Sequence, residues 1–125
     1  MRLGIDFGTT RTVVTAVRDG RHPIAAFDDG GEFREHVPGL AALRDGKLVV
    51  GWAAARAIED GSATNPIRSI KRVAQGLRPD DVVAELGVTA LDLVTAFLAD
   101  LRVQIERHSN LDAKGPFEVM ISAPA

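Results

Sequence analysis

Residues 4–12, with the sequence GIDFGTTRT, have the types and spacing best suited to chemistry in this chain. Asp6 ends a short apolar run, and Gly8, Thr9 and Thr10 follow it closely. In a tight turn, small residues let consecutive backbone N–H groups converge on an anion. A carboxylate at a strand end suits Mg²⁺, which keeps several waters and takes few protein ligands. The stretch is consistent with a phosphate and Mg²⁺ site, although a plain hairpin turn with solvated side chains explains the same residues.

Two predicted strands hold this turn. Residues 1–6 end in an apolar run, and residues 12–18 are rich in valine and threonine, which favour strands. Asp19-Gly20 is a hairpin signal, and residues 23–27 follow as a shorter third strand. This part of the chain is therefore predicted to form a three-stranded antiparallel meander, followed by a loop at residues 28–31.

The middle of the chain, residues 31–85, is predicted to form an inserted small lobe. A hairpin with Asp45-Gly46 at its tip comes first, and an alanine-rich helix over residues 51–60 follows it. Asn65-Pro66 is a predicted breaker. Residues 67–73 are predicted to form one or two helical turns, and a loop covers residues 75–81.

The clearest predicted helix covers residues 90–108. Its apolar residues at spacings of three and four form one core stripe: Leu91, Val94, Leu98, Leu101 and Ile105. Thr89 with Asp92 resembles a capping box at its start. An apolar strand follows at residues 117–122, which favours a crossover onto a parallel neighbour. Residues 1–30 and 86–125 are thus predicted to form an α/β core around the inserted lobe.

Composition excludes several classes of protein. The 125 residues contain 46% apolar and 26% charged side chains, as in an ordinary small globular domain. The net charge of −2 argues against a dedicated nucleic-acid or membrane-surface binder. Cysteine is absent, which excludes disulfides, thiolate metal sites and cysteine nucleophiles. No signal peptide or membrane-spanning run is evident, and we expect a cytoplasmic protein.

Several other residues are expected to be structural. His22, His36 and His108 are scattered and lack ligand partners at useful spacing, so they are predicted to lie on the surface or in loops. Trp52 and the phenylalanines are expected to pack in the core or the lobe. The chain stops just after the apolar strand at residues 117–122, and we expect it to be a piece of a longer protein.

Residues 4–10, Gly-Ile-Asp-Phe-Gly-Thr-Thr, followed by a valine-rich strand, resemble the first phosphate loop of the actin-like ATPase superfamily. This superfamily includes DnaK-type heat-shock chaperones, sugar kinases and actin-like filament proteins, which share a ribonuclease-H-like core. The resemblance implies an α/β fragment of the ribonuclease-H-like, actin-like ATPase fold. Its parts would be the three-stranded meander, the inserted small α+β lobe, the crossover helix and the parallel strand.

Three further stretches resemble the DnaK-type branch. Asn65-Pro66 followed by Ser69-Ile70-Lys71-Arg72 is similar to that family's Asn-Pro…Ile-Lys-Arg segment. Residues 48–51, Leu-Val-Val-Gly, are similar to its Val-Gly segment before an alanine-rich helix. Residues 119–125 resemble its apolar strand ending in Val-Pro-Ala. The four stretches occur in the family's order, which implies the N-terminal part of the ATPase domain of a DnaK-type relative.

Departures from the family pattern make this relative a divergent one. The family's Thr-Thr-Pro-Ser segment is replaced by Glu-His-Val-Pro-Gly at residues 35–39. Its Leu-x-Gly-Arg segment is replaced by Val-Ala-Gln-Gly at residues 73–76. Arg11 stands where the family usually carries asparagine or tyrosine. Its guanidinium could bind phosphate through two hydrogen bonds, or point away and pair with an acid.

The resemblance implies specific roles at the site. Lys71 is the implied catalytic lysine, placed near the γ-phosphate and the attacking water, where an ammonium stabilises developing charge. Without the resemblance, it reads as an exposed lysine in a basic turn. Asp6 is implied to act in catalysis by holding Mg²⁺ through metal-bound water. The implied phosphate-binding residues of the ATP or ADP site are Gly8, Thr9, Thr10 and Arg11.

The implied parent protein hydrolyses ATP slowly and uses its nucleotide state to control a peptide-binding domain, client polypeptides and co-chaperones. Pro124 resembles the proline of that coupling, although a strand terminator explains it equally. By resemblance, the second phosphate loop, the water-positioning acid and the adenosine pocket lie beyond Ala125, so the isolated fragment is expected to be inactive. The alternatives are a sugar-kinase-type phosphotransferase of the same superfamily and a non-catalytic actin-like scaffold or binding module.

Overall fold

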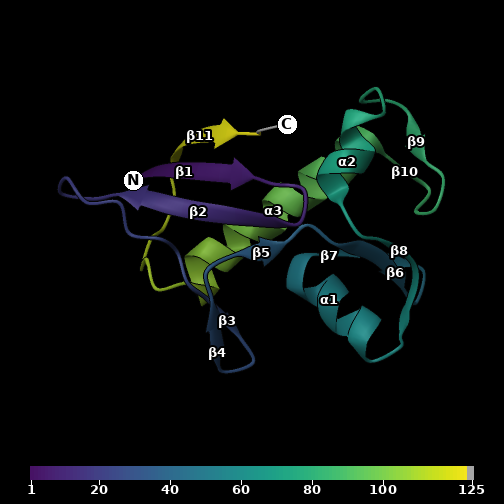
Figure 1. The fold of residues 1–125 in the computed structure, drawn as a ribbon, viewed down its shortest axis with the longest axis horizontal. Coiled ribbons are helices and arrows are strands. Elements are labelled where there is room, and N and C mark those ends of the chain that lie inside the picture. Colours follow the sequence, from purple (N-terminus) through teal and green to yellow (C-terminus); the bar gives the residue numbers. More distant parts are fainter. Residues whose placement is uncertain (124–125) are drawn as a thin grey trace.

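A computed structural model describes residues 1–123, and Pro124 with its predicted coupling role lies outside the described residues. The main sheet has the strand order β11-β1-β2-β5 (Figure 1). Its strands are β1 (Arg2–Phe7), β2 (Arg11–Val17), β5 (Val37–Pro38) and β11 (Glu118–Ser122). β1 pairs antiparallel with β2 and parallel with β11. The chain is therefore of the predicted mixed α/β class.

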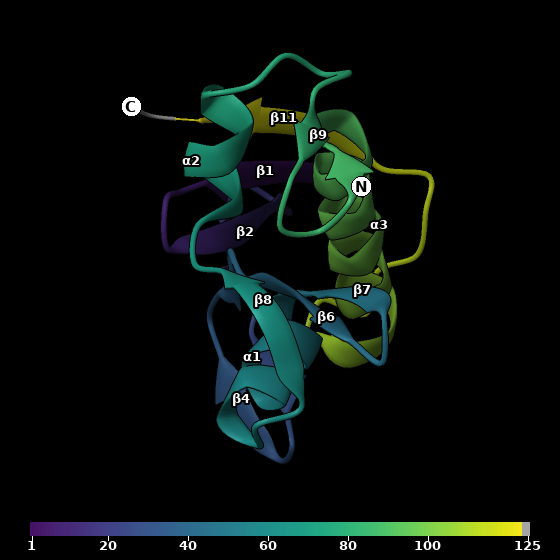
Figure 2. The same ribbon diagram turned by 90° about the vertical axis from the view of Figure 1, so that its right-hand side faces the viewer.

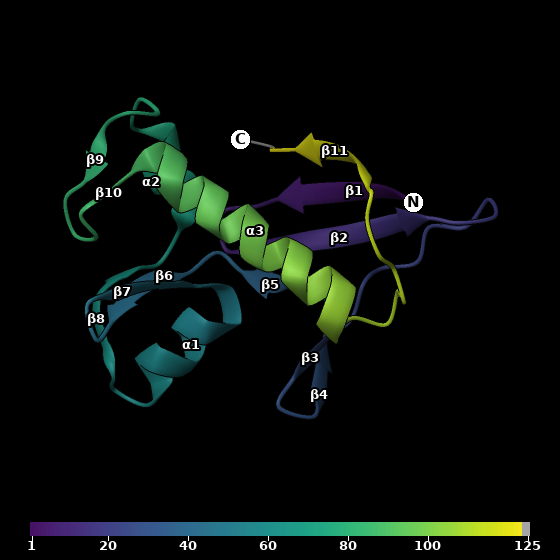
Figure 3. The same cartoon turned by 180° about the vertical axis from the view of Figure 1, so that it is seen from behind.

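One face of this sheet is covered by helix α3 (Ala90–His108), which crosses it diagonally (Figure 3). Alternate residues of β1 and β2 are buried, as the period of a half-buried strand requires. Phe7 from β1 stacks on Phe97 from α3, with ring centroids 5.6 Å apart. The helix bounds agree with the predicted ones, and Thr89 Oγ1 accepts a hydrogen bond from the Asp92 N–H at 3.1 Å.

The predicted core stripe of this helix is wrong at one end. Leu91 is 59% exposed, and Val94 and Leu98 are only partly buried. The buried residues of the helix are Ala90, Leu93, Phe97, Leu101 and Ile105. The helix is rotated so that Phe97 faces Phe7, which turns Leu91 toward solvent. Apolar spacing alone allows both rotations because the sequence offers two overlapping stripes.

The predicted third strand at residues 23–27 is also incomplete. It contacts β2 through the isolated bridge Thr15↔Ile24, where Ala16 N–H donates to the Pro23 carbonyl at 3.0 Å. The chain then forms the hairpin β3 (Phe27–Asp29) and β4 (Glu32–Arg34), where a loop was predicted. Pro23 has no N–H to donate to a ladder, which limits regular pairing at this point.

A second sheet has the order β7-β6-β8 and packs with helix α1, in the lower part of Figure 2. Its elements are β6 (Ala41–Arg44), β7 (Lys47–Val50), α1 (Gly51–Glu59) and β8 (Ala63–Ile67). Asp45 and Gly46 both have positive φ, as the tight two-residue hairpin requires. The predicted breaker Asn65-Pro66 lies inside β8, which tolerates proline because β8 is an edge strand.

The remaining elements are the short helix α2 (Ile70–Gln75) and the strand pair β9 (Val82–Val83) and β10 (Val88–Thr89). The predicted helical segment at 67–73 begins later, because Ser69 acts as its N-cap and accepts from the Arg72 N–H at 3.2 Å. The residues before it remain in β8. Within the described part of the chain, no helix is both long enough and apolar enough to cross a membrane.

Candidate phosphate-binding site

The turn between β1 and β2 is closed by a hydrogen bond from the Gly8 N–H to the Arg11 carbonyl, 3.1 Å long. A Cβ atom on Gly8 would lie 2.6 Å from that carbonyl oxygen, a distance that real Cβ atoms do not tolerate. A side chain at position 8 would therefore force the turn to move. Thr9 is half-buried, and Thr10 and Arg11 are exposed at the end of the sheet.

Lys71 lies in the first turn of α2 and is only 3% exposed. Figure 2 places α2 beside the end of the sheet at which β1 and β2 are joined. A pocket of about 290 Å³ opens between them. Its lining residues are Asp6, Gly8, Thr9, Thr10, Arg11, Val13 and Lys71. The structure thus brings every predicted site residue together, and it places Lys71 far from the exposed position that composition alone suggests.

The backbone of Gly39 joins the turn to α2. Its N–H donates to the Thr10 carbonyl at 3.1 Å, and its own carbonyl accepts from the Ile70 N–H at 2.9 Å. Gly39 follows β5 directly, and β5 pairs with the start of β2 at Arg11↔Pro38. Sequence reasoning did not single out this residue, although Gly39 ends the segment at residues 35–39 in which the chain departs from the family pattern.

The charged side chains of the pocket are not paired with other charged side chains of the described residues. Within residues 1–123, none of Asp6, Arg11 and Lys71 forms an ion pair. The predicted alternative in which Arg11 pairs with an acid is therefore not seen. One carboxylate and two cationic groups line the same small volume, which is a suitable arrangement for an anion with a divalent cation.

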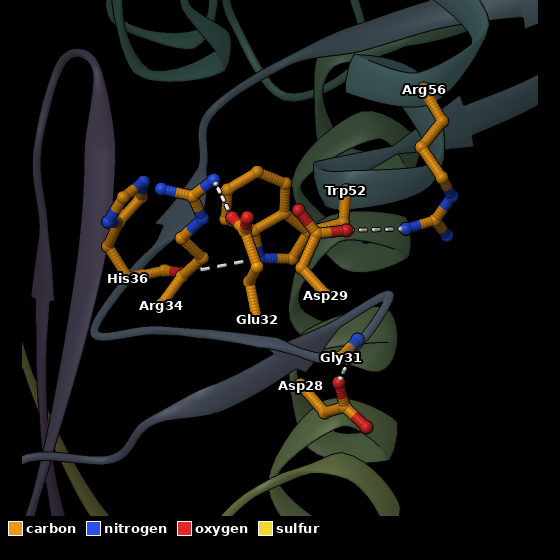
Figure 4. Close-up of polar contacts among 8 residues, drawn as sticks. All are labelled: Asp28, Asp29, Gly31, Glu32, Arg34, His36, Trp52 and Arg56. Carbon is orange, nitrogen blue, oxygen red and sulfur yellow. Dashed lines mark hydrogen bonds and ion pairs between the residues drawn. The ribbon is translucent and has the colours of Figure 1, made fainter.

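His36 lies close enough to Arg11 for their charges to interact. Partial burial lowers the pKa of His36 below its usual value, and the Arg11 and Arg34 guanidinium groups lower it further. The His36 ring packs on Trp52 with centroids 5.3 Å apart, and Trp52 Nε1 donates to the His36 carbonyl at 3.2 Å (Figure 4). Trp52 therefore has the predicted packing role, and His36 lies between β4 and β5, outside the strands, as predicted, but packs on Trp52 there.

The β3–β4 hairpin is tied to α1 by polar contacts (Figure 4). Arg56 from α1 forms an ion pair with Asp29, 3.1 Å long. Within the hairpin itself, Asp28 Oδ1 accepts from the Gly31 N–H at 2.8 Å. No group of three or more His, Cys, Asp or Glu side chains that could hold a metal occurs among the described residues.

Thr12, the second residue of β2, is another residue that sequence reasoning missed. Its side chain is fully buried, and its Oγ1 has no hydrogen-bond partner among the described residues. A buried hydroxyl without a partner costs free energy, which makes this position unusual in the core. Nothing in the residue pattern of β2 distinguishes Thr12 from Thr15, the other threonine of that strand.

Comparisons with known proteins find relatives for part of the chain. No family model matches it. The chaperone protein DnaK of Mycoplasmopsis synoviae (strain 53) is 41% identical over 73 residues, which cover 57% of this chain. The chaperone protein DnaK of Metamycoplasma hominis is 34% identical over 71 residues, again 57% of the chain.

The chain spans about 11% of the length of these curated relatives. The similarity favours neither the sugar-kinase alternative nor the actin-like scaffold, since both relatives are chaperones by name. The resemblance that the four sequence motifs indicated is confirmed: this chain is similar to a short segment of the DnaK-type heat-shock chaperones.

Proposed function

We propose that this chain is the N-terminal part of the ATPase domain of a DnaK-type chaperone relative, and that its β1–β2 turn and Lys71 hold the phosphates of ATP or ADP. The observation that carries the proposal is the shared pocket of Asp6, the turn and Lys71. These residues come from two segments that are far apart in the sequence. A plain hairpin turn would not need a buried lysine beside it.

The residues of the pocket fit the Mg²⁺ that accompanies a nucleotide. Asp6 is exposed at the end of β1 and forms no ion pair within residues 1–123, so its oxygens are free for a hydrated cation. When bound, Mg²⁺ would neutralise part of the phosphate charge. Asp6 is the residue that we expect to hold it, through metal-bound water.

Each remaining residue has a distinct part in binding. The Gly8 N–H is used within the turn, so the N–H groups and hydroxyls of Thr9 and Thr10 are the donors for phosphate oxygens. Arg11 supplies a second, charged donor, and its place in the pocket favours phosphate over a pairing acid. Lys71 is only 3% exposed and lines the pocket, so its ammonium would face a phosphate placed there and stabilise charge that develops in the transition state.

The activity of the whole protein follows by analogy with the relatives. Residues 31–85 would form the inserted lobe that supplies Lys71, and residues 1–30 and 86–125 the first part of a ribonuclease-H-like core. The parent would hydrolyse ATP and use the nucleotide state to control client binding with co-chaperones. Such a reaction also needs residues that lie outside this segment. We therefore expect the isolated chain to bind nucleotide without hydrolysing it.

Calorimetric titration of the chain with Mg·ADP and Mg·ATP tests the proposal. We expect weak binding that Asp6→Ala abolishes or strongly reduces, because the variant removes the carboxylate beside the turn. Asp80→Ala is the matched control, since Asp80 is an exposed carboxylate that does not line the pocket. Equal affinities for the two variants, or no nucleotide binding by a longer chain that contains the rest of the ATPase domain, would contradict it.

A further inference from the structure

Gly39 occupies an unusual position between the two halves of the pocket. It is buried directly after β5, and its peptide groups form one hydrogen bond on each side. The N–H binds the Thr10 carbonyl in the turn, and the carbonyl binds the Ile70 N–H at the start of α2. Ile70 is fully buried and directly precedes Lys71.

We propose that Gly39 is a positioning residue for Lys71: its backbone holds the β1–β2 turn and α2 at a constant separation, so that the lysine faces the turn. This inference rests on the proposed function for the identity of the anion, but the geometric part stands without it. Gly39 acts through its hydrogen bonds to Ile70 and Thr10, and it is not itself one of the residues that line the pocket.

The requirement at this position is for a peptide N–H rather than for the absence of a side chain. A Cβ on Gly39 would have its nearest contacts at 3.7 Å from the Thr9 carbonyl oxygen and 3.9 Å from that of Thr10. These are ordinary van der Waals distances, and the φ of Gly39 is not in the left-handed region. Alanine therefore fits, whereas proline removes the N–H that binds Thr10.

The arrangement also couples the two halves of the pocket. An anion that draws the turn N–H groups toward itself shifts the Thr10 peptide, and the hydrogen bond to Gly39 passes that shift to Ile70. The start of α2 then moves with the turn. Lys71 follows because its backbone belongs to the same helical turn as Ile70.

Amide hydrogen exchange on the unmodified chain is the first test. We expect the Gly39 and Ile70 amides to exchange far more slowly than the exposed amide of Thr10, because both are hydrogen-bonded and buried. Exchange of these two amides as fast as that of Thr10 would overturn the proposal. This measurement needs neither a variant nor a nucleotide.

Distance measurement between spin labels is the second test. The chain has no cysteine, so labels on Thr10→Cys and Arg72→Cys, two exposed positions, report the separation of the turn from α2. We expect one narrow distance distribution in this background and with Gly39→Ala added. With Gly39→Pro we expect a broader or longer one, and an unchanged distribution would overturn the proposal. If Gly39→Pro does not fold, the amide exchange rates of the unmodified chain decide whether the proposal stands.

Titration with Mg·pyrophosphate separates this inference from the proposed function. Without labels, Gly39→Ala should bind pyrophosphate like the parent chain, and Gly39→Pro about three- to tenfold more weakly, as the loss of one hydrogen bond implies. If the parent chain does not bind pyrophosphate but its Gly39 and Ile70 amides exchange slowly, the proposed function is contradicted and the positioning role is not. Equal binding by the two variants counts against the positioning role alone.

Discussion

Lys71 is the residue whose surroundings say most about the site. Lys71 is 3% exposed, lines the pocket and forms no ion pair within residues 1–123. Its Nζ is not among the fully buried side-chain nitrogens and oxygens that lack a partner in the described residues. The proposed function accounts for this position, because an anion bound in the pocket would pair with the lysine and stabilise the folded state.

Replacement of Lys71 by methionine tests whether the lysine serves anion binding or only the packing of the folded state. Lys71→Met keeps an unbranched side chain of similar size and removes the charge, so we expect the free energy of unfolding to stay equal or rise. Nucleotide or pyrophosphate binding should be lost in the same variant. Urea unfolding and calorimetry measure the two effects.

The control for this substitution is Lys47→Met, because Lys47 is exposed on β7 and outside the pocket. It should change neither stability nor anion binding appreciably. A Lys71→Met variant that is much less stable and still binds pyrophosphate would show that the lysine is structural.

At the scale of the element, α3 and α1 meet at a carboxylate. Asp100 from α3 has a buried Oδ2 without a hydrogen-bond partner among residues 1–123, and a Cβ on Gly51 at the start of α1 would lie 2.9 Å from that atom. Burial raises the pKa of Asp100, while a hydrogen bond from Gln104 and the charges of Arg56 and His108 oppose the rise. The folded state therefore holds the proton of this carboxyl more tightly than the unfolded chain.

This raised pKa predicts a pH dependence with a definite sign. The contribution of Asp100 is fully present below its unfolded pKa, near the ordinary value of 3.8, and is lost as the pH rises through the higher folded pKa. Asp100→Asn removes this loss. We expect the variant to gain stability relative to the parent chain at about pH 7, and the gain to shrink toward about pH 4. Urea unfolding at both pH values measures it, and a gain that grows on acidification would contradict the prediction.

The rotation of α3 makes a second prediction at this scale. Leu93 is fully buried and Leu91 is 59% exposed, although both are leucines in the same helical turn. Leu93→Ala should lower the free energy of unfolding by about 2–5 kcal/mol through lost burial and a cavity. Leu91→Ala should change it by about 0.5 kcal/mol or less. Equal costs in urea unfolding would contradict this rotation, and a larger cost for Leu91→Ala would mean that the helix has the rotation expected from the sequence stripe.

At the scale of the whole molecule, β11 is an edge strand of the main sheet. All five of its residues are exposed, and Val119, Met120 and Ile121 are apolar. Beside it, an apolar groove of about 400 Å³ runs between β1, β11 and α3. An open edge with apolar side chains favours pairing between chains.

We therefore expect the isolated chain to self-associate as its concentration rises. Met120→Lys places a charge on the edge strand and should reduce this association, as measured by sedimentation. Val103→Lys is the control, because Val103 is a partly exposed apolar residue on α3 outside the groove. If both variants associate like the parent chain, β11 is not the contact.

Local chemistry made much of this molecule predictable. The alternation of β1 and β2, the Asp45-Gly46 turn and the capped helix at Ala90–His108 each depend on neighbouring residues, and each occurs in the structure close to its predicted place. The predictions failed where a distant contact decided the outcome. The predicted breaker Asn65-Pro66 lies within β8 but has no partner on β6, because the register of the pair shifts at this point. Phe97 was turned inward by Phe7.

By itself, the sequence determined the residue types of the site, their order and the resemblance to DnaK-type chaperones, because motifs and turns are local properties of the chain. The resemblance implied that Lys71 lies near the phosphates, but only the tertiary structure showed its burial, the pocket that it shares with the β1–β2 turn, and the link between the two through Gly39. The physical reason is that this proximity depends on backbone hydrogen bonds and packing between segments far apart in the sequence. Residue periodicity contains no record of such contacts.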